Sequence, residues 1–156
     1  MEHSIDRALL IEVARDILDE VAPRELPIFP AACNAYFIDP TTVIKQSRSR
    51  DAFLGMGLDP TTLLTPHVLH ILGEVCIFLT GVASDAVKKG LADAVHEAVW
   101  SMIKTTDPKA QSLLSLEQIE HVREIVLRTA RGSHLPAALA QSLANAVTAR
   151  LVSSRK

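Results

Sequence analysis

Aromatic side chains are scarce in this chain: four Phe, one Tyr and one Trp make up 4% of its 156 residues. A core with so few large rings must be built mainly from Ala, Leu, Val and Ile, which supply most of the 48% hydrophobic content. Ala and Leu favour helices, and the glycines and prolines fall between apolar segments more than within them. The composition therefore predicts an all-α protein.

Cysteine is nearly absent as well. Cys33 and Cys76 lie in apolar surroundings without a CxxC spacing. This setting indicates two buried, small hydrophobic side chains and argues against a disulfide framework or a cysteine metal centre. The N-terminus also lacks the basic and apolar regions of a signal peptide, so we expect a cytoplasmic protein.

The sequence lacks the motifs that would support catalysis or nucleic-acid binding. A net charge of −2 provides no strongly basic surface for nucleic acid. No glycine-rich phosphate loop or GxSxG nucleophile motif occurs, so the sequence indicates no cofactor and no small-molecule substrate. His96 and Glu97 begin like the zinc-protease motif HExxH, but Trp100 stands where the second His must be. We therefore expect a protein that is not an enzyme.

The longest apolar run covers residues 63–83 and is interrupted by two histidines and Glu74. Its length is close to the roughly 20 residues that span a bilayer. A carboxylate near the middle of a span costs roughly 2.5–3.5 kcal/mol, which offsets much of the gain from the apolar side chains. The run is therefore a weak candidate for a stable transmembrane helix.

A seam of apolar residues within this run favours packing against other helices. Its members recur at alternating spacings of four and three: Val68, Leu72, Val75, Leu79 and Val82. We interpret them as the interaction surface of a helix enclosed by its own chain or by other subunits. In the alternative interpretation, the protein is a membrane-active effector whose central helix, about residues 63–83, inserts into a bilayer after release.

His67, His70 and Glu74 share one face of the same predicted helix. Imidazole and carboxylate groups at spacings of three and four can bind a divalent metal such as zinc, given a fourth ligand from elsewhere. The same positions also form the narrow polar stripe that an amphipathic helix turns toward solvent. If these residues bind a metal, the protein would be an all-α metal-dependent enzyme. If they only form the polar stripe of the helix, no ligand is needed to explain them.

Helix signals in the first part of the chain are strong. Residues 4–21 repeat apolar side chains every three or four positions, Pro23 and Pro27 end this pattern, and residues 29–38 predict a short second helix. The sequence Asp-Pro-Thr-Thr, in which Asp caps a helix and Pro occupies its first turn, occurs at residues 39–42 and 59–62. Residues 46–58 predict a flexible internal connection.

The second half predicts a central helical region over residues 66–104, either one helix or two that meet near Gly90. Residues 115–152 predict an antiparallel C-terminal hairpin of two helices. Ser115 and Gln118 form a capping box at its start, and Gly132 marks the end of its first helix.

These patterns combine into one architecture and one function. We expect a single helical domain over residues 1–156, a compact bundle of about five to seven helices around a long apolar central helix. The leading functional hypothesis is a non-enzymatic helical interaction or assembly module, an adaptor that self-associates or docks onto a larger protein.

Overall fold

The computed structural model describes residues 7–43, 64–87, 99 and 114–153. Every regular element within these ranges is helical, which confirms the all-α prediction for the described part of the chain.

The N-terminal part forms three consecutive elements, α1 (Arg7–Val21), η1 (Pro23–Ile28) and α2 (Phe29–Ile38). The apolar face predicted for α1 is the face it buries, comprising Leu9, Leu10, Val13, Ala14, Ile17 and Leu18. The helix ends before Pro23, and the proline-containing segment that follows is a 3-10 helix. Both predicted N-terminal helices are thus confirmed, and residues 4–6 of the first prediction lie outside the described ranges.

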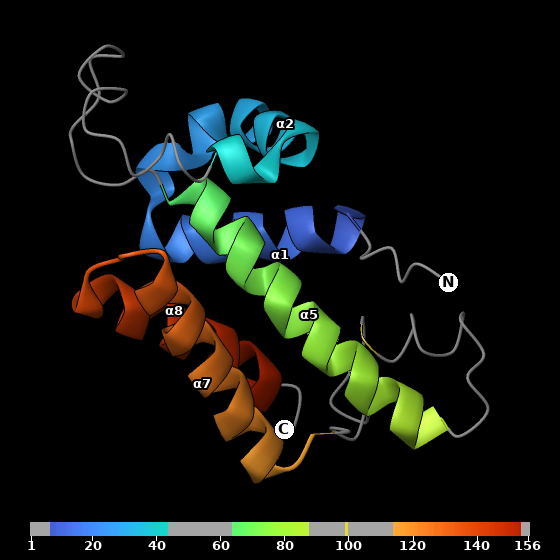
Figure 1. Cartoon of the computed structure of the whole chain (residues 1–156). Coiled ribbons are helices and arrows are strands. Elements are labelled where there is room, and N and C mark those ends of the chain that lie inside the picture. Colours follow the sequence, from blue (N-terminus) through green and yellow to red (C-terminus); the bar gives the residue numbers. More distant parts are fainter. Residues whose placement is uncertain (1–6, 44–63, 88–98, 100–113, 154–156) are drawn as a thin grey trace.

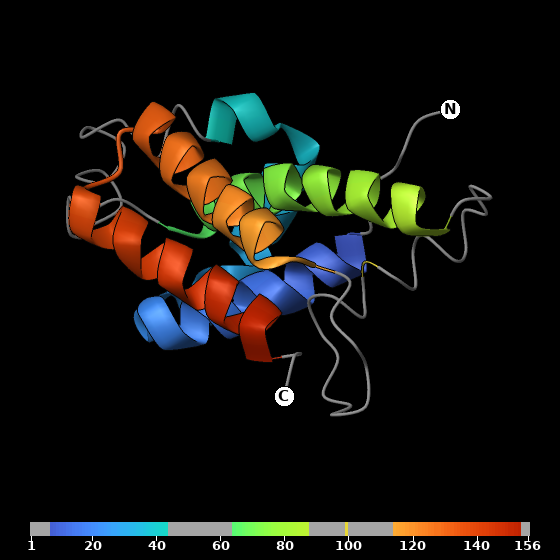
Figure 2. The ribbon, with the colours of Figure 1, turned by 90° about the horizontal axis from the view of Figure 1, so that it is seen from below.

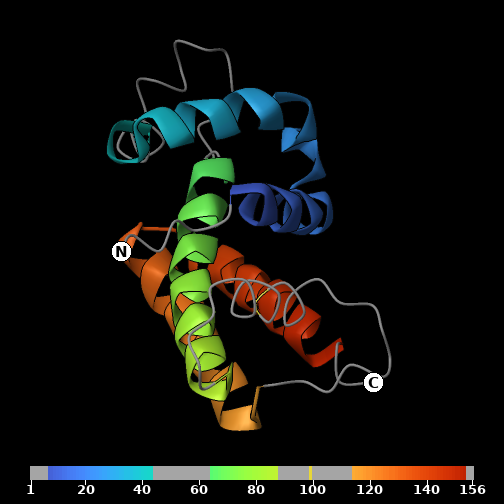
Figure 3. The same ribbon diagram turned by 90° about the vertical axis from the view of Figure 1, so that its right-hand side faces the viewer.

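α5 (Thr65–Val87) is the long central helix, and it packs against α1, α2 and α7 (Leu116–Gly132). In Figure 1 it runs diagonally through the molecule, with α1 and α2 near its N-terminal end. Figure 3 shows α2 lying across that end of α5. The region that would decide between one central helix and two, residues 88–98 and 100–104, lies outside the described residues.

The apolar seam of α5 faces the interior of the chain. Val68, Leu72, Val75 and Leu79 are each at most 1% exposed, and Val82 is half-buried. Helices of the same chain cover the seam, because the neighbouring helices α1, α2 and α7 supply apolar faces of their own. Of the two kinds of enclosure expected from the sequence, the structure shows the one by helices of the same chain, and contact of the seam with another protein stays a prediction.

α7 and α8 (Ala137–Ser153) follow each other in the chain and pack side by side, and α8 also contacts α1 (Figure 2). Ser115 and Gln118 cap the start of α7 reciprocally, as the sequence predicts: the Gln118 N–H donates to Ser115 Oγ, and the Ser115 N–H donates to Gln118 Oε1. Arg123 of α7 joins the two helices by donating to Asn145 Oδ1 and Thr148 Oγ1. An ion pair between Arg150 and Asp16, 3.2 Å apart, ties α8 to α1.

α7 ends at Gly132, as the sequence predicts, but the turn after it does not use this glycine. Gly132 is the last helical residue, and the left-handed conformation that usually favours glycine falls on His134, at φ 60°. The Leu135 N–H donates to the Ala130 carbonyl and the His134 N–H donates to the Arg131 carbonyl, which is the hydrogen-bond pattern of a Schellman motif. The buried Leu135 side chain holds this turn against the core, so a histidine occupies the strained position.

The first Asp-Pro-Thr-Thr sequence starts a helical turn as predicted. Thr42 donates to the Asp39 carboxylate from its backbone N–H (3.3 Å) and from its hydroxyl (2.7 Å). These hydrogen bonds lower the pKa of Asp39 below its usual value. The second such sequence and the predicted connection over residues 46–58 lie outside the described ranges.

Glu25 caps the central helix from a distant part of the chain. The side chain is 4% exposed, and its carboxylate accepts hydrogen bonds from the Leu64 N–H, the Thr65 N–H and the Thr65 hydroxyl, each 2.8 Å long. The first N–H groups of a helix have no partner within it, and Leu64 has no side-chain acceptor to cap them. The carboxylate supplies that acceptor and also lies at the positive end of the helix dipole.

We expect Glu25→Ala to lower the free energy of unfolding by about 3 kcal/mol, because it leaves three buried donors without an acceptor. Glu25→Gln retains an acceptor oxygen but loses the charge, so it should cost about 1–2 kcal/mol. Urea unfolding followed by circular dichroism measures both. Glu20→Ala, an exposed change on α1, is the matched control and should stay within about 0.5 kcal/mol of the parent. Equal effects at the two positions would contradict the capping role.

A glycine at the left-handed position should stabilise the protein. His134→Gly removes the strain of a positive φ, and we expect the free energy of unfolding to rise by about 0.4–1 kcal/mol. His134→Ala retains a Cβ at the same place and should bring no gain. The same urea titration distinguishes the two variants, and a loss of stability in His134→Gly would count against the assigned turn.

Candidate functional site

The three residues of the metal hypothesis differ in their surroundings. His67 is completely buried, His70 is half-buried and Glu74 is exposed. Among the residues that the structure describes, no three His, Cys, Asp or Glu side chains are grouped as a metal ion would require. Glu74 fits the solvent-facing stripe, whereas the buried His67 does not. Zinc binding by these residues stays a prediction without support from their arrangement.

Both cysteines are buried, as the sequence predicts. Burial raises the pKa of the Cys33 thiol to about 11. The thiolate is the reactive form of cysteine, so Cys33 is suited to packing and not to nucleophilic chemistry near neutral pH.

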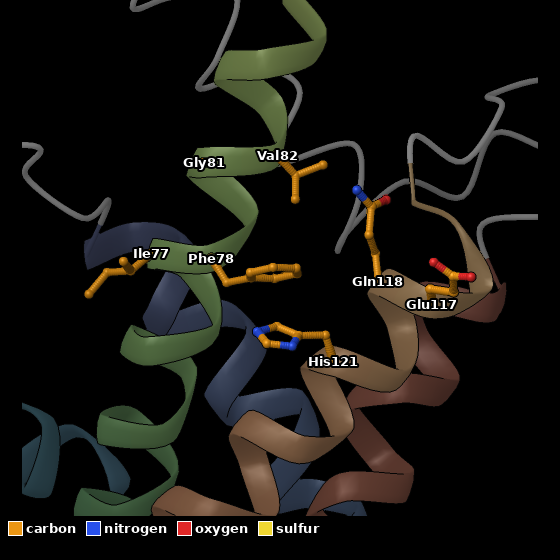
Figure 4. A pocket seen from close by; sticks show the side chains of 7 residues that line it. All are labelled: Ile77, Phe78, Gly81, Val82, Glu117, Gln118 and His121. Atoms are coloured by element: carbon orange, nitrogen blue, oxygen red, sulfur yellow. The ribbon is translucent and has the colours of Figure 1, made fainter.

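A groove of about 470 Å³ lies between α5 and the first turns of α7. It is lined by Ile77, Phe78, Gly81, Val82, Glu117, Gln118 and His121. Figure 4 shows the side chains of Phe78 and Val82 directed from α5 toward α7, with Gln118 and His121 opposite them. The groove thus has one largely apolar wall on α5 and one polar wall on α7.

Two rings in tilted contact line the groove. The ring centroids of Phe78 and His121 are 4.6 Å apart, with 42° between the ring planes. One helical turn further along α5, Gly81 leaves open space, since a Cβ built there would meet no atom within 4 Å. Position 81 therefore has room for a side chain beside the groove.

Apolar and acidic groups surround the groove. Ile77 is 56% exposed, and Leu116, at the start of α7, is 69% exposed. On α7, Glu117 lines the groove, and the Glu124 carboxylate lies 3.9 Å from Nδ1 of His121. An apolar floor with carboxylates on one rim can hold a ligand that combines an apolar surface with a positive charge.

Sequence reasoning missed this groove and the capping role of Glu25. A signal for Glu25 exists: Leu64 cannot cap the helix that follows it, so an acceptor must come from elsewhere in the chain. The groove has a weaker signal in Ile77 and Leu116, which fall outside the buried apolar faces of their helices. The residues that face them across the groove depend on how α5 packs against α7. The spacing of residues along the chain does not predict this packing.

One helix among the described residues is long and apolar enough to cross a membrane by length and composition. It covers Thr65–Ser84 of α5, with a mean hydropathy of 1.5, and half of this window is buried inside the protein. Core helices of soluble proteins share these properties.

Comparison with known proteins finds no matching family, no matching curated protein and no matching solved structure.

We expect Cys33 to resist alkylation in the native protein. A thiol pKa near 11 instead of 9 lowers the thiolate fraction at pH 8 by about 100-fold. The rate of reaction with iodoacetamide, followed by mass spectrometry of the peptide that contains Cys33, should be lower by at least that factor than in urea. It should rise with pH up to about 11. Equal rates in native and unfolded protein at pH 8 would contradict this assignment.

Proposed function

We propose that this protein is a helical interaction module that binds an amphipathic, basic helix of a partner protein in the groove between α5 and α7. The observation that carries the proposal is an open groove with apolar residues of α5 on one side and, on the other, an acidic rim made of Glu117, which lines it, and the further glutamates exposed on α7. Helix-in-groove recognition uses an apolar face of the bound helix as its anchor.

The apolar contribution comes from α5. Phe78 and Val82 are half-buried, and Ile77 is mostly exposed, so part of each side chain still contacts water. Covering apolar surface stabilises a complex by roughly 25 cal/mol per Å² before the costs of association. The vacant position at Gly81 gives room for an apolar side chain of the partner.

The charge of the partner follows from the rim. Glu117, Glu120 and Glu124 are exposed on α7, and of these Glu120 lies 3.8 Å from Arg123 in an ion pair. His121 offsets Glu124 only when the imidazole is protonated. Lysine or arginine on the bound helix would complement this rim, and each exposed pair would add about 0.2–1 kcal/mol.

We further propose that the described helices form one bundle around α5, with α7 and α8 as its antiparallel hairpin, and that the protein acts in the cytoplasm. The packing of α5 against α1, α2 and α7 supports the first part. A single rigid unit would keep the two walls of the groove in register.

Selection from a phage-displayed library of random peptides, each long enough for roughly four helical turns, tests the groove. We expect enriched peptides with apolar residues at spacings of three and four and a net positive charge. Gly81→Leu adds a side chain beside the groove without a clash and should abolish their binding. Gly73→Leu, on the same helix and also in open space, is the matched control and should leave binding unchanged.

The double variant Glu117→Gln, Glu124→Gln tests the rim separately. It should weaken the selected basic peptides about threefold to tenfold, as measured by fluorescence anisotropy at low salt. Peptides that bind Gly81→Leu as tightly as the parent would contradict docking in the groove. Enrichment of acidic peptides would contradict the proposed charge of the partner.

A further inference from the structure

α2 exposes an apolar face that no described element covers. No residue from Leu26 to Ile38 is charged, and Asn34 is the polar one among them. The inner side of the helix buries Phe29 and Cys33. The outer side leaves Ile38 83% exposed and Ile28, the residue before the helix, 38% exposed, with Ala31 and Ala35 also exposed between them.

These four residues form one stripe, which we call the α2 stripe: Ile28, Ala31, Ala35 and Ile38. Ile28 is the last residue of η1 and the N-cap of α2, and its backbone is in the right-handed helical region. The spacings of three, four and three therefore place it on the same side as the three α2 residues. A helix that is apolar around its whole circumference is normally enclosed by other helices. The described chain encloses only one side of α2, so the other side is available to a second molecule.

The order of residues in the α2 stripe makes it complementary to the α2 stripe of a second copy. Read in either direction, the stripe is Ile, Ala, Ala, Ile with the same spacings. An antiparallel two-fold arrangement therefore places Ile28 of one copy against Ile38 of the other, and Ala31 against Ala35. The small alanines at the centre allow the helix backbones to approach, and the isoleucines close the contact at both ends.

We propose that the protein forms a two-fold dimer through the α2 stripe, with the two α2 helices antiparallel. The charges agree with this arrangement. The stripe carries no charge, so two copies do not repel each other there. Asp39 follows the C-terminal end of α2 and is exposed, and the antiparallel pairing brings its carboxylate to the positive N-terminal end of the other α2.

The size of the contact sets the strength of the dimer. A helix of ten residues is about 15 Å long, so the interface belongs to the small, transient class. We expect reversible association in the micromolar range. This inference does not depend on the groove, because α2 contributes no residue to it.

Sedimentation equilibrium over a concentration series tests the dimer with the full chain. The parent should dimerise, and Ile38→Glu should weaken the association about tenfold or more, since it places two charges in an apolar contact. Leu116→Glu makes the same kind of change at an exposed residue of α7 and should leave the association unchanged. Ile38 is mostly exposed, so thermal melts should show that both variants fold like the parent.

The orientation is tested with cysteines. Under mild oxidation, a mixture of Ala31→Cys and Ala35→Cys proteins should form a mixed disulfide faster than either variant alone forms a disulfide with itself. Residue 31 of one copy opposes residue 35 of the other, and neither residue opposes its own counterpart. A monomer at every concentration, a dimer unaffected by Ile38→Glu, or faster disulfides within each single variant would overturn the proposal. None of these three results would bear on whether the groove between α5 and α7 binds a peptide.

Discussion

The buried carboxylate of Glu25 fixes where the central helix begins. It joins the segment after α1 to the first residues of α5 through three hydrogen bonds, across 39 to 40 residues of sequence. Apolar packing can hold a helix against its neighbours but permits it to slide or rotate, whereas hydrogen bonds to particular N–H groups do not. α1, α2 and α7 all pack on α5. The residue at which α5 begins therefore determines which of its residues each of these helices contacts.

With its start fixed, α5 divides into a buried side and an accessible side. The seam from Val68 to Leu79 is covered by other helices of the chain, and Ile77 and Gly81 face outward. This division explains how a helix of membrane-like length and hydropathy can serve as a core helix. The capping box at Ser115 and the Arg123 contacts to α8 hold α7 beside it, so the groove has two well-supported walls.

Predictions from the sequence were confirmed where they depend on interactions between residues close together in the chain. The capping box at Ser115, the Asp39 helix start, the bounds of α2 and the apolar face of α1 depend on residues within a few positions of one another. Predictions that depend on distant partners fared differently. The sequence left the covering of the α5 seam open, because its periodicity is the same whether the covering helices belong to this chain or to another. Gly132 ends α7 as predicted, but the left-handed residue of the turn is His134, next to the buried Leu135.

The sequence alone determined that the described chain is helical, where its first two helices run, and which face of α1 is apolar, because these properties follow from spacing, capping and backbone constraints within single segments. Tertiary structure decided the rest. It buried His67 while leaving Glu74 in water, brought Glu25 to the start of α5, and set Phe78 against His121 across the groove. Each of these outcomes depends on the relative placement of helices. This placement arises from the fit between whole helix surfaces, so it cannot be predicted from any single segment of the sequence.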